Sequence, residues 1–376
     1  MEPSIVRRAA RRAGADVGAA CPPPHRSEER EEARDRIALT GDELAETRAL
    51  TGGLARRYGR AEHEEFLNDA AVIAHDLPRR IRRTLSRFRL FEPASAMIVV
   101  SGWQVEEEKI GPTPAHWKQH AARNDTCEDD MLLLLLASLL GEPIGWSTQQ
   151  DGRLVHDVLP IKGHEHEQVG TGSEEAITWH VEDAFHPHRG DYLGLMCLRN
   201  PDRVPTTFAP ISKVRLSADE LAVLSSPRFV IRPDNSHLPR NAGDGASRTP
   251  EEDALVRKAY RRIEQLAADP ERIPILFGDL KTPYVRMDPY FMDPPADPVA
   301  RAIFETMQRK VDEALEDRVL TPGDICFIDN FQAVHGRKPF KARYDGRDRW
   351  LKRINVVRDL RKSREARVSA ASRVMY

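Results

Sequence analysis

The sequence has few cysteines, no long apolar run and almost no excess charge. Its four cysteines, Cys21, Cys127, Cys197 and Cys326, are scattered and form no C-x-x-C pair. This spacing excludes a zinc ribbon and a disulfide framework, and it favours a reducing cytoplasm. The longest apolar run, within residues 131–140, is too short to span a bilayer. A formal net charge of -2 supplies no global field for nucleic acid. We therefore expect a cytoplasmic protein with neither nucleic-acid nor membrane partners.

The N-terminal residues 1–36 contain few large apolar side chains and are rich in arginine, alanine and glutamate. Such a segment buries too little surface to offset the entropy of ordering, so we expect a disordered tail. It also lacks the apolar segment of a secretory signal. Residues 37–376 have the composition of a globular chain, because 40% of all residues are hydrophobic and 31% are charged. We expect them to form a single domain.

Helical patterns dominate the first part of this domain. Thr40 and Glu43 have the spacing of a capping box, which predicts a helix start. A second helical stretch covers residues 63–88 and is expected to break at Pro78. Residues 127–140 predict a third helix that is buried on most sides. Further helices are expected over residues 217–224, 250–268 and 298–315.

After Gly141 the pattern changes to short apolar runs separated by turn residues, which is typical of strands in a sandwich or barrel. The predicted strands cover residues 143–146, 154–161, 192–198, 229–231, 273–277, 324–328 and 350–357. The polar stretch 233–250 has no periodicity, and a long structureless loop of this kind is often a lid.

The tripeptide His180-Val181-Glu182 is the first candidate for metal chemistry. In a strand, residues i and i+2 point to the same face, so His180 and Glu182 can reach one metal ion. Alone, an H-x-E pattern is more often a solvated strand face. The pair His164 and His166 offers a rival, but its charged, glycine-flanked surroundings indicate a solvated loop.

Two further residues complete a recognisable set. His335 follows the apolar strand Ile325–Ile328 and can supply a third ligand. Arg349 begins the last predicted strand, where its planar fork would clamp a carboxylate with two parallel hydrogen bonds. Two histidines and one carboxylate on one face of an octahedral iron(II) leave positions open for a chelating co-substrate and dioxygen. The set predicts a non-haem iron(II) site.

These segments carry a family resemblance. Residues 179–185, 191–200 and 329–337, together with Arg349 and Arg353, resemble the clavaminate synthase-like 2-oxoglutarate oxygenases, especially the branch that hydroxylates free basic amino acids. That branch includes arginine β-hydroxylases and bacterial lysine hydroxylases. The resemblance covers roughly residues 90–360. It implies a mainly β fold with helical additions: a distorted double-stranded β-helix (jelly roll, cupin-like) with N-terminal helices packed on one sheet.

The resemblance also implies roles for individual residues. Iron(II) would be held by His180, Glu182 and His335, with 2-oxoglutarate and dioxygen as co-substrates. Arg349 would hold the far carboxylate of 2-oxoglutarate with help from Thr207, for which the neighbouring Thr206 is nearly as good a candidate.

The substrate would be a free basic L-amino acid. By the same resemblance, Arg353 would bind its α-carboxylate, and Gln149 and Glu182 its amino group. Asp234, on the lid, and Asp288 would face the cationic end. Asp288 is a single acid, whereas a pair of acids would suit a guanidinium, which tilts the expectation slightly towards lysine over arginine.

The expected reaction is hydroxylation of a β- or γ-methylene. Three alternatives stay beside it. A zinc deaminase would need a P-C-x-x-C segment, which is missing. A halogenase would replace the ligating carboxylate with a small residue, whereas Glu182 is present. A vestigial, non-enzymatic binding protein would be expected to lose a metal ligand or the arginine clamp. The sequence gives neither the carbon attacked nor the oligomeric state.

Overall fold

The computed structural model describes residues 35–121, 123–239 and 249–376. The expected tail therefore lies outside the described residues, apart from its last two; Arg36 already belongs to the first strand. Half of the expected lid, residues 240–248, lies outside them as well. No helix in the described ranges is both long and apolar enough to cross a membrane.

An eight-stranded sheet forms the larger half of the fold, and its order is β1-β2-β14-β6-β16-β3-β17, with β4 paired to β16. Its strands are β1 (Arg36–Ala38), β2 (Met97–Ser101), β3 (Glu142–Trp146), β4 (Val155–Val158), β6 (Tyr192–Arg199), β14 (Ile325–Asp329), β16 (Trp350–Val357) and β17 (Val374–Met375). The central strands are apolar on both faces. In β14, Ile325 and Phe327 face the helices, while Cys326 and Ile328 face a second sheet.

The second sheet has four antiparallel strands in the order β13-β7-β15-β5. Its strands are β13 (Glu316–Arg318), β7 (Thr206–Pro210), β15 (Ala333–Arg337) and β5 (Ile177–His180). Phe208 and Ala333 of this sheet share one buried cluster with Leu195 and Leu351 of the larger sheet, so the two sheets face each other. This is the distorted double-stranded β-helix that the sequence predicted.

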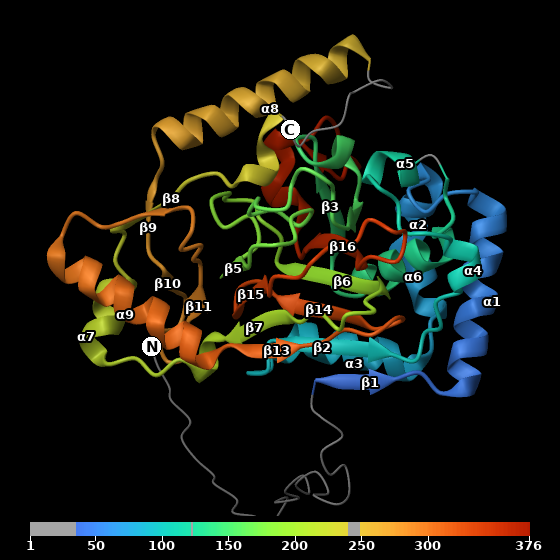
Figure 1. Ribbon diagram of the computed structural model, residues 1–376, viewed down its shortest axis with the longest axis horizontal. Coiled ribbons are helices and arrows are strands. Elements are labelled where there is room, and N and C mark those ends of the chain that lie inside the picture. Colours follow the sequence, from blue (N-terminus) through green and yellow to red (C-terminus); the bar gives the residue numbers. More distant parts are fainter. Residues whose placement is uncertain (1–34, 122, 240–248) are drawn as a thin grey trace, which may run out of the picture. The chain divides into compact units, whose positions relative to one another are not determined.

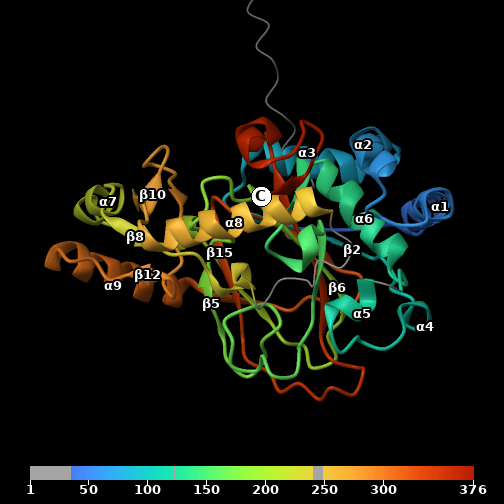
Figure 2. The ribbon, with the colours of Figure 1, turned by 90° about the horizontal axis from the view of Figure 1, so that it is seen from above.

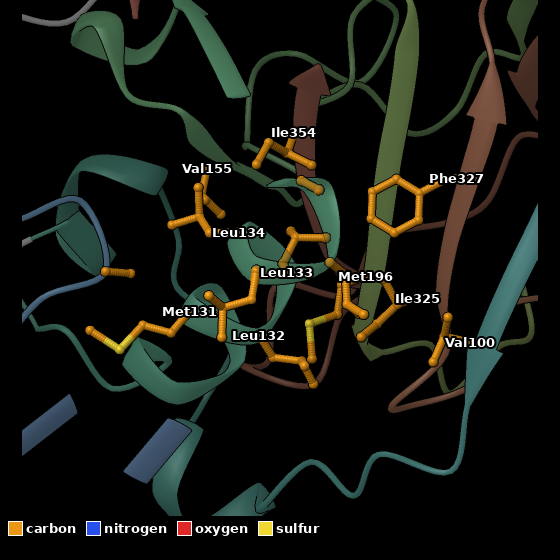
Figure 3. Close-up of a cluster of buried hydrophobic side chains, with 14 of the residues drawn as sticks. Val100, Met131, Leu132, Leu133, Leu134, Val155, Met196, Ile325, Phe327 and Ile354 are labelled. Atoms are coloured by element: carbon orange, nitrogen blue, oxygen red, sulfur yellow. The ribbon is translucent and has the colours of Figure 1, made fainter. Parts of the chain in front are cut away.

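The N-terminal helices cover the outer face of the larger sheet, as expected. They are α1 (Gly41–Tyr58), α2 (Glu64–Ile73), α3 (Arg79–Phe91) and α6 (Cys127–Ser138). The Thr40–Glu43 capping box starts α1, and the second helical stretch breaks before Pro78. Helix α6 is buried all round, and Leu132, Leu133 and Leu134 pack near Met196 and Ile354 (Figure 3). A helix that is apolar on every side belongs in a core.

A separate group of elements lies at the other end of the two sheets, away from α1 and α6 (Figures 1 and 2). It contains α7 (Ala218–Leu224), α9 (Pro298–Ala314), the three-stranded sheet β12-β8-β9 and the hairpin β10-β11. The short strands are β8 (Phe229–Ile231), β9 (Arg272–Ile273), β10 (Leu276–Phe277), β11 (Tyr284–Val285) and β12 (Met292–Asp293). The single strand predicted over 273–277 is thus two strands of different sheets, because Pro274 interrupts it.

The remaining helices connect these parts. Helix α8 (Pro250–Ala268) begins with a capping box at Thr249, and short helices α4 (Glu107–Ile110) and α5 (Trp117–Ala121) precede α6. A single 3-10 turn covers Asn235–His237, at the start of the expected lid. Cys127, Cys197 and Cys326 are free and buried.

Candidate active site

Three candidate metal ligands meet between the two sheets. His180 is the last residue of β5, and His335 of β15 lies directly opposite it in the antiparallel register. Glu182 follows two residues after His180. Its Oε2 lies 3.5 Å from His180 Nε2 and 3.3 Å from His335 Nε2. Cross-strand neighbours on one face come close enough to share one ion, so strand pairing supplies the grouping that sequence spacing alone cannot.

Neighbouring groups orient these donors. Asn330 accepts a hydrogen bond from Glu182 N at 2.8 Å and donates to Glu182 O at 3.0 Å, which fixes the backbone of the carboxylate ligand. His180 Nδ1 lies 2.8 Å from Thr178 O. Since a carbonyl only accepts, Nδ1 carries the proton, and in the neutral ring Nε2 keeps its lone pair for a metal.

A glycine allows the two histidine strands to approach each other. A Cβ on Gly336 would lie 2.5 Å from Ile177 O and 2.8 Å from Thr207 Oγ1. A side chain at this position would therefore push β5 and β7 away from β15. The close approach keeps His335 in register with His180.

The charges around the donors suit a cation. Burial lowers the pKa of His180, but the hydrogen bond to Glu182 and the charge of Asp288 outweigh it and raise that pKa to about 9. Burial would raise the pKa of Glu182, yet Arg353 and the two histidines hold it well below its usual range. Burial and the charge of His180 lower the pKa of His335. Glu182 is thus ionised, and the acidic groups Glu182 and Asp288 favour a positive charge at the position of His180.

Two buried arginines line one part of the cavity beside the metal ligands. Arg349 is 6% exposed and not a surface cation, and its Nε has no hydrogen-bond partner among the described residues. Burial lowers the pKa of Arg349 to about 10, so it remains charged at neutral pH. Arg337 lies on the same strand face as His335 and also lines the cavity. Buried cations with spare donors form a natural receptor for a carboxylate.

The threonine beside these arginines is Thr206, not the preferred candidate Thr207. In β7, Thr206 is opposite Arg337 and lines the cavity, whereas Thr207 is opposite Gly336 on the other face. Successive strand residues alternate between faces, so only one of the two can point inward.

Arg353 connects the metal site with a second cavity. Its Nη1 pairs with Glu182 Oε1, and its Nη2 lies 2.8 Å from both Gln149 Oε1 and His156 Nδ1. Gln149 lines the adjoining cavity rather than the one containing the metal ligands, and Arg353 lines both. Sequence reasoning missed His156, which shares the inward face of paired strands β4 and β16 with Arg353.

Carboxylates also line the cavity that contains the metal ligands. Asp234, Asp288 and the half-exposed Tyr290 all line it. Burial, together with the nearby charge of Asp234, raises the pKa of Asp288 to about 6. Asp234 Oδ1 accepts hydrogen bonds from Ser236 N at 2.8 Å and from Ser236 Oγ at 2.5 Å.

The rival histidines take no part in this site. His166 is exposed and lies near Glu174 and Glu175, while His164 Nδ1 contacts Thr171 Oγ1. Sequence reasoning also missed Arg337 and Tyr290. The i+2 spacing from His335 and from Asp288, respectively, was the only available signal for them.

The donor set fits iron(II). Two imidazole nitrogens and one carboxylate oxygen lie within 4.8 Å of one another. One side of this group faces a cavity lined by cationic and anionic side chains. Such a facial triad with open positions is the arrangement that non-haem iron(II) oxygenases use.

Comparison with known proteins decides the family. No family model matches the chain. An enduracididine beta-hydroxylase from Streptomyces hygroscopicus is 46% identical over 342 residues, covering 90% of this chain and 99% of that protein. The chain belongs to the clavaminate synthase-like iron(II) and 2-oxoglutarate oxygenases. An L-ornithine/L-arginine 3-hydroxylase from Catenulispora acidiphila is 42% identical over 344 residues, and the match covers 91% of this chain and 99% of that protein.

Solved structures agree with this membership. The non-heme iron oxygenase OrfP, in complex with iron, succinate and (3S)-hydroxy-L-Arg, superimposes with a TM-score of 0.84 at 41% identity, over 91% of this oxygenase and 99% of OrfP. OrfP has also been solved with iron and alpha-ketoglutaric acid. This oxygenase accordingly uses iron(II), with 2-oxoglutarate and dioxygen as co-substrates.

Proposed function

We propose that the oxygenase hydroxylates the β-carbon of free L-arginine or a closely similar guanidine amino acid. The observation that carries the proposal is the mixed charge of one cavity. The cavity that contains the three metal donors is also lined by a cationic side chain, Arg353, and by two acidic ones, Asp288 and Asp234. An amino acid with an anionic head and a cationic side chain complements this set of charges.

In this proposal His180, Glu182 and His335 hold the iron. The buried guanidinium of Arg349, assisted by Arg337 and Thr206, receives the far carboxylate of 2-oxoglutarate. When bound, iron(II) with 2-oxoglutarate and dioxygen would supply the oxidant that attacks an unactivated C–H bond. The protein contributes orientation: hydrogen bonds to neighbouring groups already hold His180, Glu182 and Arg353, so little of their entropy is lost when substrate binds.

Arg353 and Gln149 bind the head of the substrate. Arg353 offers two guanidinium nitrogens to the α-carboxylate, and Glu182 and Gln149 offer oxygens to the amino group. Since Glu182 is also a metal ligand, contact with it keeps the α- and β-carbons near the iron. The names of the two relatives, a beta-hydroxylase and a 3-hydroxylase, support the same carbon.

Asp234 and Asp288 bind the cationic end, and Tyr290 adds an aromatic surface beside them. A planar guanidinium stacks on an aromatic ring and also donates to two carboxylates, whereas an ammonium group is a compact point charge. The relatives support arginine too. An L-lysine 3-hydroxylase from Catenulispora acidiphila is only 28% identical to this chain, and OrfP has been solved with L-Arg and with L-homoarginine. The preference for lysine that the sequence indicated is not supported.

The test is an amino-acid panel with anaerobically iron-loaded enzyme and 2-oxoglutarate. The panel contains L-arginine, L-homoarginine, L-ornithine, L-lysine and L-citrulline, the last being a neutral isostere of arginine. Mass spectrometry reads the gain of one oxygen, and NMR of the product locates it. We expect L-arginine to turn over fastest with oxygen on the β-carbon. Faster turnover of citrulline, or of lysine, would contradict the assignment of the cationic end.

A further inference from the structure

The residue that follows the metal ligand Glu182 has an unusual backbone. Asp183 has a φ of 49°, in the left-handed region that few residues other than glycine adopt. Its side chain is buried and makes three hydrogen bonds: Oδ2 accepts from Trp146 Nε1 at 2.7 Å and from Asn355 Nδ2 at 3.1 Å, and Oδ1 lies 3.0 Å from His237 Nε2. Such a strained conformation persists when its surroundings hold it in place.

His237 is the most buried of these partners. It is 0% exposed, although it follows a surface turn. Its Nε2 faces Asp183, its Nδ1 lies 2.7 Å from Thr148 Oγ1, and its ring packs edge-on against Trp146 and Phe185. The ring is therefore fixed on both nitrogens and two sides.

The segment that His237 ends carries substrate-facing groups. Asp234 caps the 3-10 turn Asn235–His237, and both Asp234 and Ser236 line the cavity of the metal site. Gln149 Nε2 donates to Ser236 Oγ at 2.5 Å, and that hydroxyl contacts Asp234 Oδ1. His237 is the buried end of this turn.

From this geometry we infer that His237 is a positioning residue for substrate recognition: its bond to Asp183 anchors the turn 234–237 to the metal-binding segment and so holds Asp234 at the cationic end of the substrate. The inference rests on the proposed function. Asp234 has a short side chain, and a small displacement of its turn would move the carboxylate out of hydrogen-bonding range.

A second metal site is the other reading of this cluster, because Asp183, Asp234 and His237 offer three donor atoms within 4.8 Å of one another. The hydrogen bonds argue against it. Both oxygens of Asp183 already accept from nitrogen donors, and Asp234 Oδ1 already accepts from Ser236. These direct bonds account for the cluster without an ion.

The test compares His237→Leu, which removes both ring nitrogens, with His237→Gln, whose side-chain amide can still form a hydrogen bond. His186→Leu is the matched control: His186 is also buried and packs against Trp146, but its side chain makes no hydrogen bond to Asp183 or Asp234 among the described residues. Two readouts are taken on iron- and 2-oxoglutarate-loaded enzyme. One is KM and kcat for L-arginine and L-citrulline, and the other is hydrogen exchange of residues 234–239 by mass spectrometry.

We expect His237→Leu to raise the KM for L-arginine at least tenfold and to lower the preference for arginine over citrulline. The affinity for 2-oxoglutarate should stay within twofold. Exchange at 234–239 should accelerate, and His237→Gln should be intermediate in each readout. If His237→Leu fails to fold, His237→Gln decides by the same criteria.

An unchanged arginine KM with unchanged exchange would overturn the inference. So would an equal loss for arginine and citrulline, or an equal effect of His186→Leu, since either would indicate general damage to the core. If wild-type enzyme turns over no basic amino acid, the proposed function fails. The exchange at 234–239 still decides whether His237 anchors the turn.

Discussion

The two histidines of the metal centre are held differently. His180 Nδ1 is fixed by Thr178 O, whereas His335 Nδ1 has no hydrogen-bond partner among the residues that the structure describes. His335 therefore depends on its strand and on the metal for orientation. Loss of its imidazole leaves one histidine and one carboxylate, which hold iron poorly.

His335→Ala should accordingly abolish both bound iron and succinate production, and His180→Ala should do the same. Iron content after gel filtration and succinate release measure this. His164→Ala, in the loop that the rival pattern occupies, is the control and should keep both. Near-native succinate production in His335→Ala would mean that the triad is misassigned.

Arg349 is buried, whereas Arg347, two residues earlier, is exposed and does not line the cavity, which makes a sharp comparison. Arg349→Lys replaces a bidentate fork with a point charge, and losing one charge-assisted hydrogen bond costs about 1.5–3 kcal/mol. The concentration of 2-oxoglutarate needed for half-maximal rate should rise tenfold or more, whereas Arg347→Lys should change it little. An unchanged requirement in Arg349→Lys would remove Arg349 from the 2-oxoglutarate site.

Asp288 tests substrate charge at a single position. Asp288→Asn preserves shape but removes the charge opposite the guanidinium, so the KM for L-arginine should rise more than tenfold, a change equivalent to about 1.4 kcal/mol. The KM for neutral L-citrulline should change much less. Equal effects on both substrates would show that Asp288 only supports the loop, through its bond to Phe291 N.

Among the elements, helix α6 combines an apolar body with buried acids in its first turn. Asp129 Oδ1 accepts from Trp103 Nε1 at 2.8 Å, yet burial raises the pKa of Asp129 to about 6. The unfolded chain has a pKa near 3.9. Because the folded pKa is the higher one, the folded protein binds the extra proton between these values. Asp129 therefore lowers stability at neutral pH, and this cost disappears as the pH falls from about 6 to 4.

Asp129→Asn should raise the free energy of unfolding at pH 8 by up to about 3 kcal/mol, from a shift of roughly two pKa units, and by about half as much at pH 5. The amide oxygen still accepts from Trp103. Urea denaturation at the two pH values measures the difference. Asp42→Asn, in the exposed first turn of α1, is the control. A gain that does not vary with pH would contradict burial as its cause.

At the scale of the whole molecule, the site lies between the two facing sheets and takes residues from both. His180 and His335 belong to the smaller sheet, while Arg353 and the residue after Arg349 belong to β16 of the larger one. Ligands that bridge the sheets bind the folded state only. Occupancy should therefore stabilise the entire fold.

Iron(II) with 2-oxoglutarate, each at about 100 times its dissociation constant, should add about 2.7 kcal/mol per ligand and raise the Tm by several degrees. Anaerobic differential scanning fluorimetry detects this shift, and chelation should reverse it. His335→Ala should show no shift. Stabilisation of that variant equal to wild type would place the ligands elsewhere.

Sequence determined the chemistry and the class of fold. The residue types of the triad favour iron(II), and that of Arg349 favours a carboxylate. The spacing of apolar residues, together with the turn residues between them, predicts many of the strands and helices. The sequence could not show whether Thr206 or Thr207 points into the cavity, because the neighbouring strands that define the inner face were not known. The register of β7 against β15 places Thr206, and not Thr207, opposite Arg337 on the face that lines the cavity.

Tertiary structure alone also brought Arg337 beside Arg349, paired His237 with Asp183, and separated Gln149 from the metal cavity. Arg337 and Arg349 are 12 positions apart in the sequence, and His237 and Asp183 are 54 apart. Gln149 and its partner Arg353 are 204 apart. Such contacts depend on how sheets stack and on which loops lie over them. The propensities of short segments do not predict such packing, so it is known only from the folded structure.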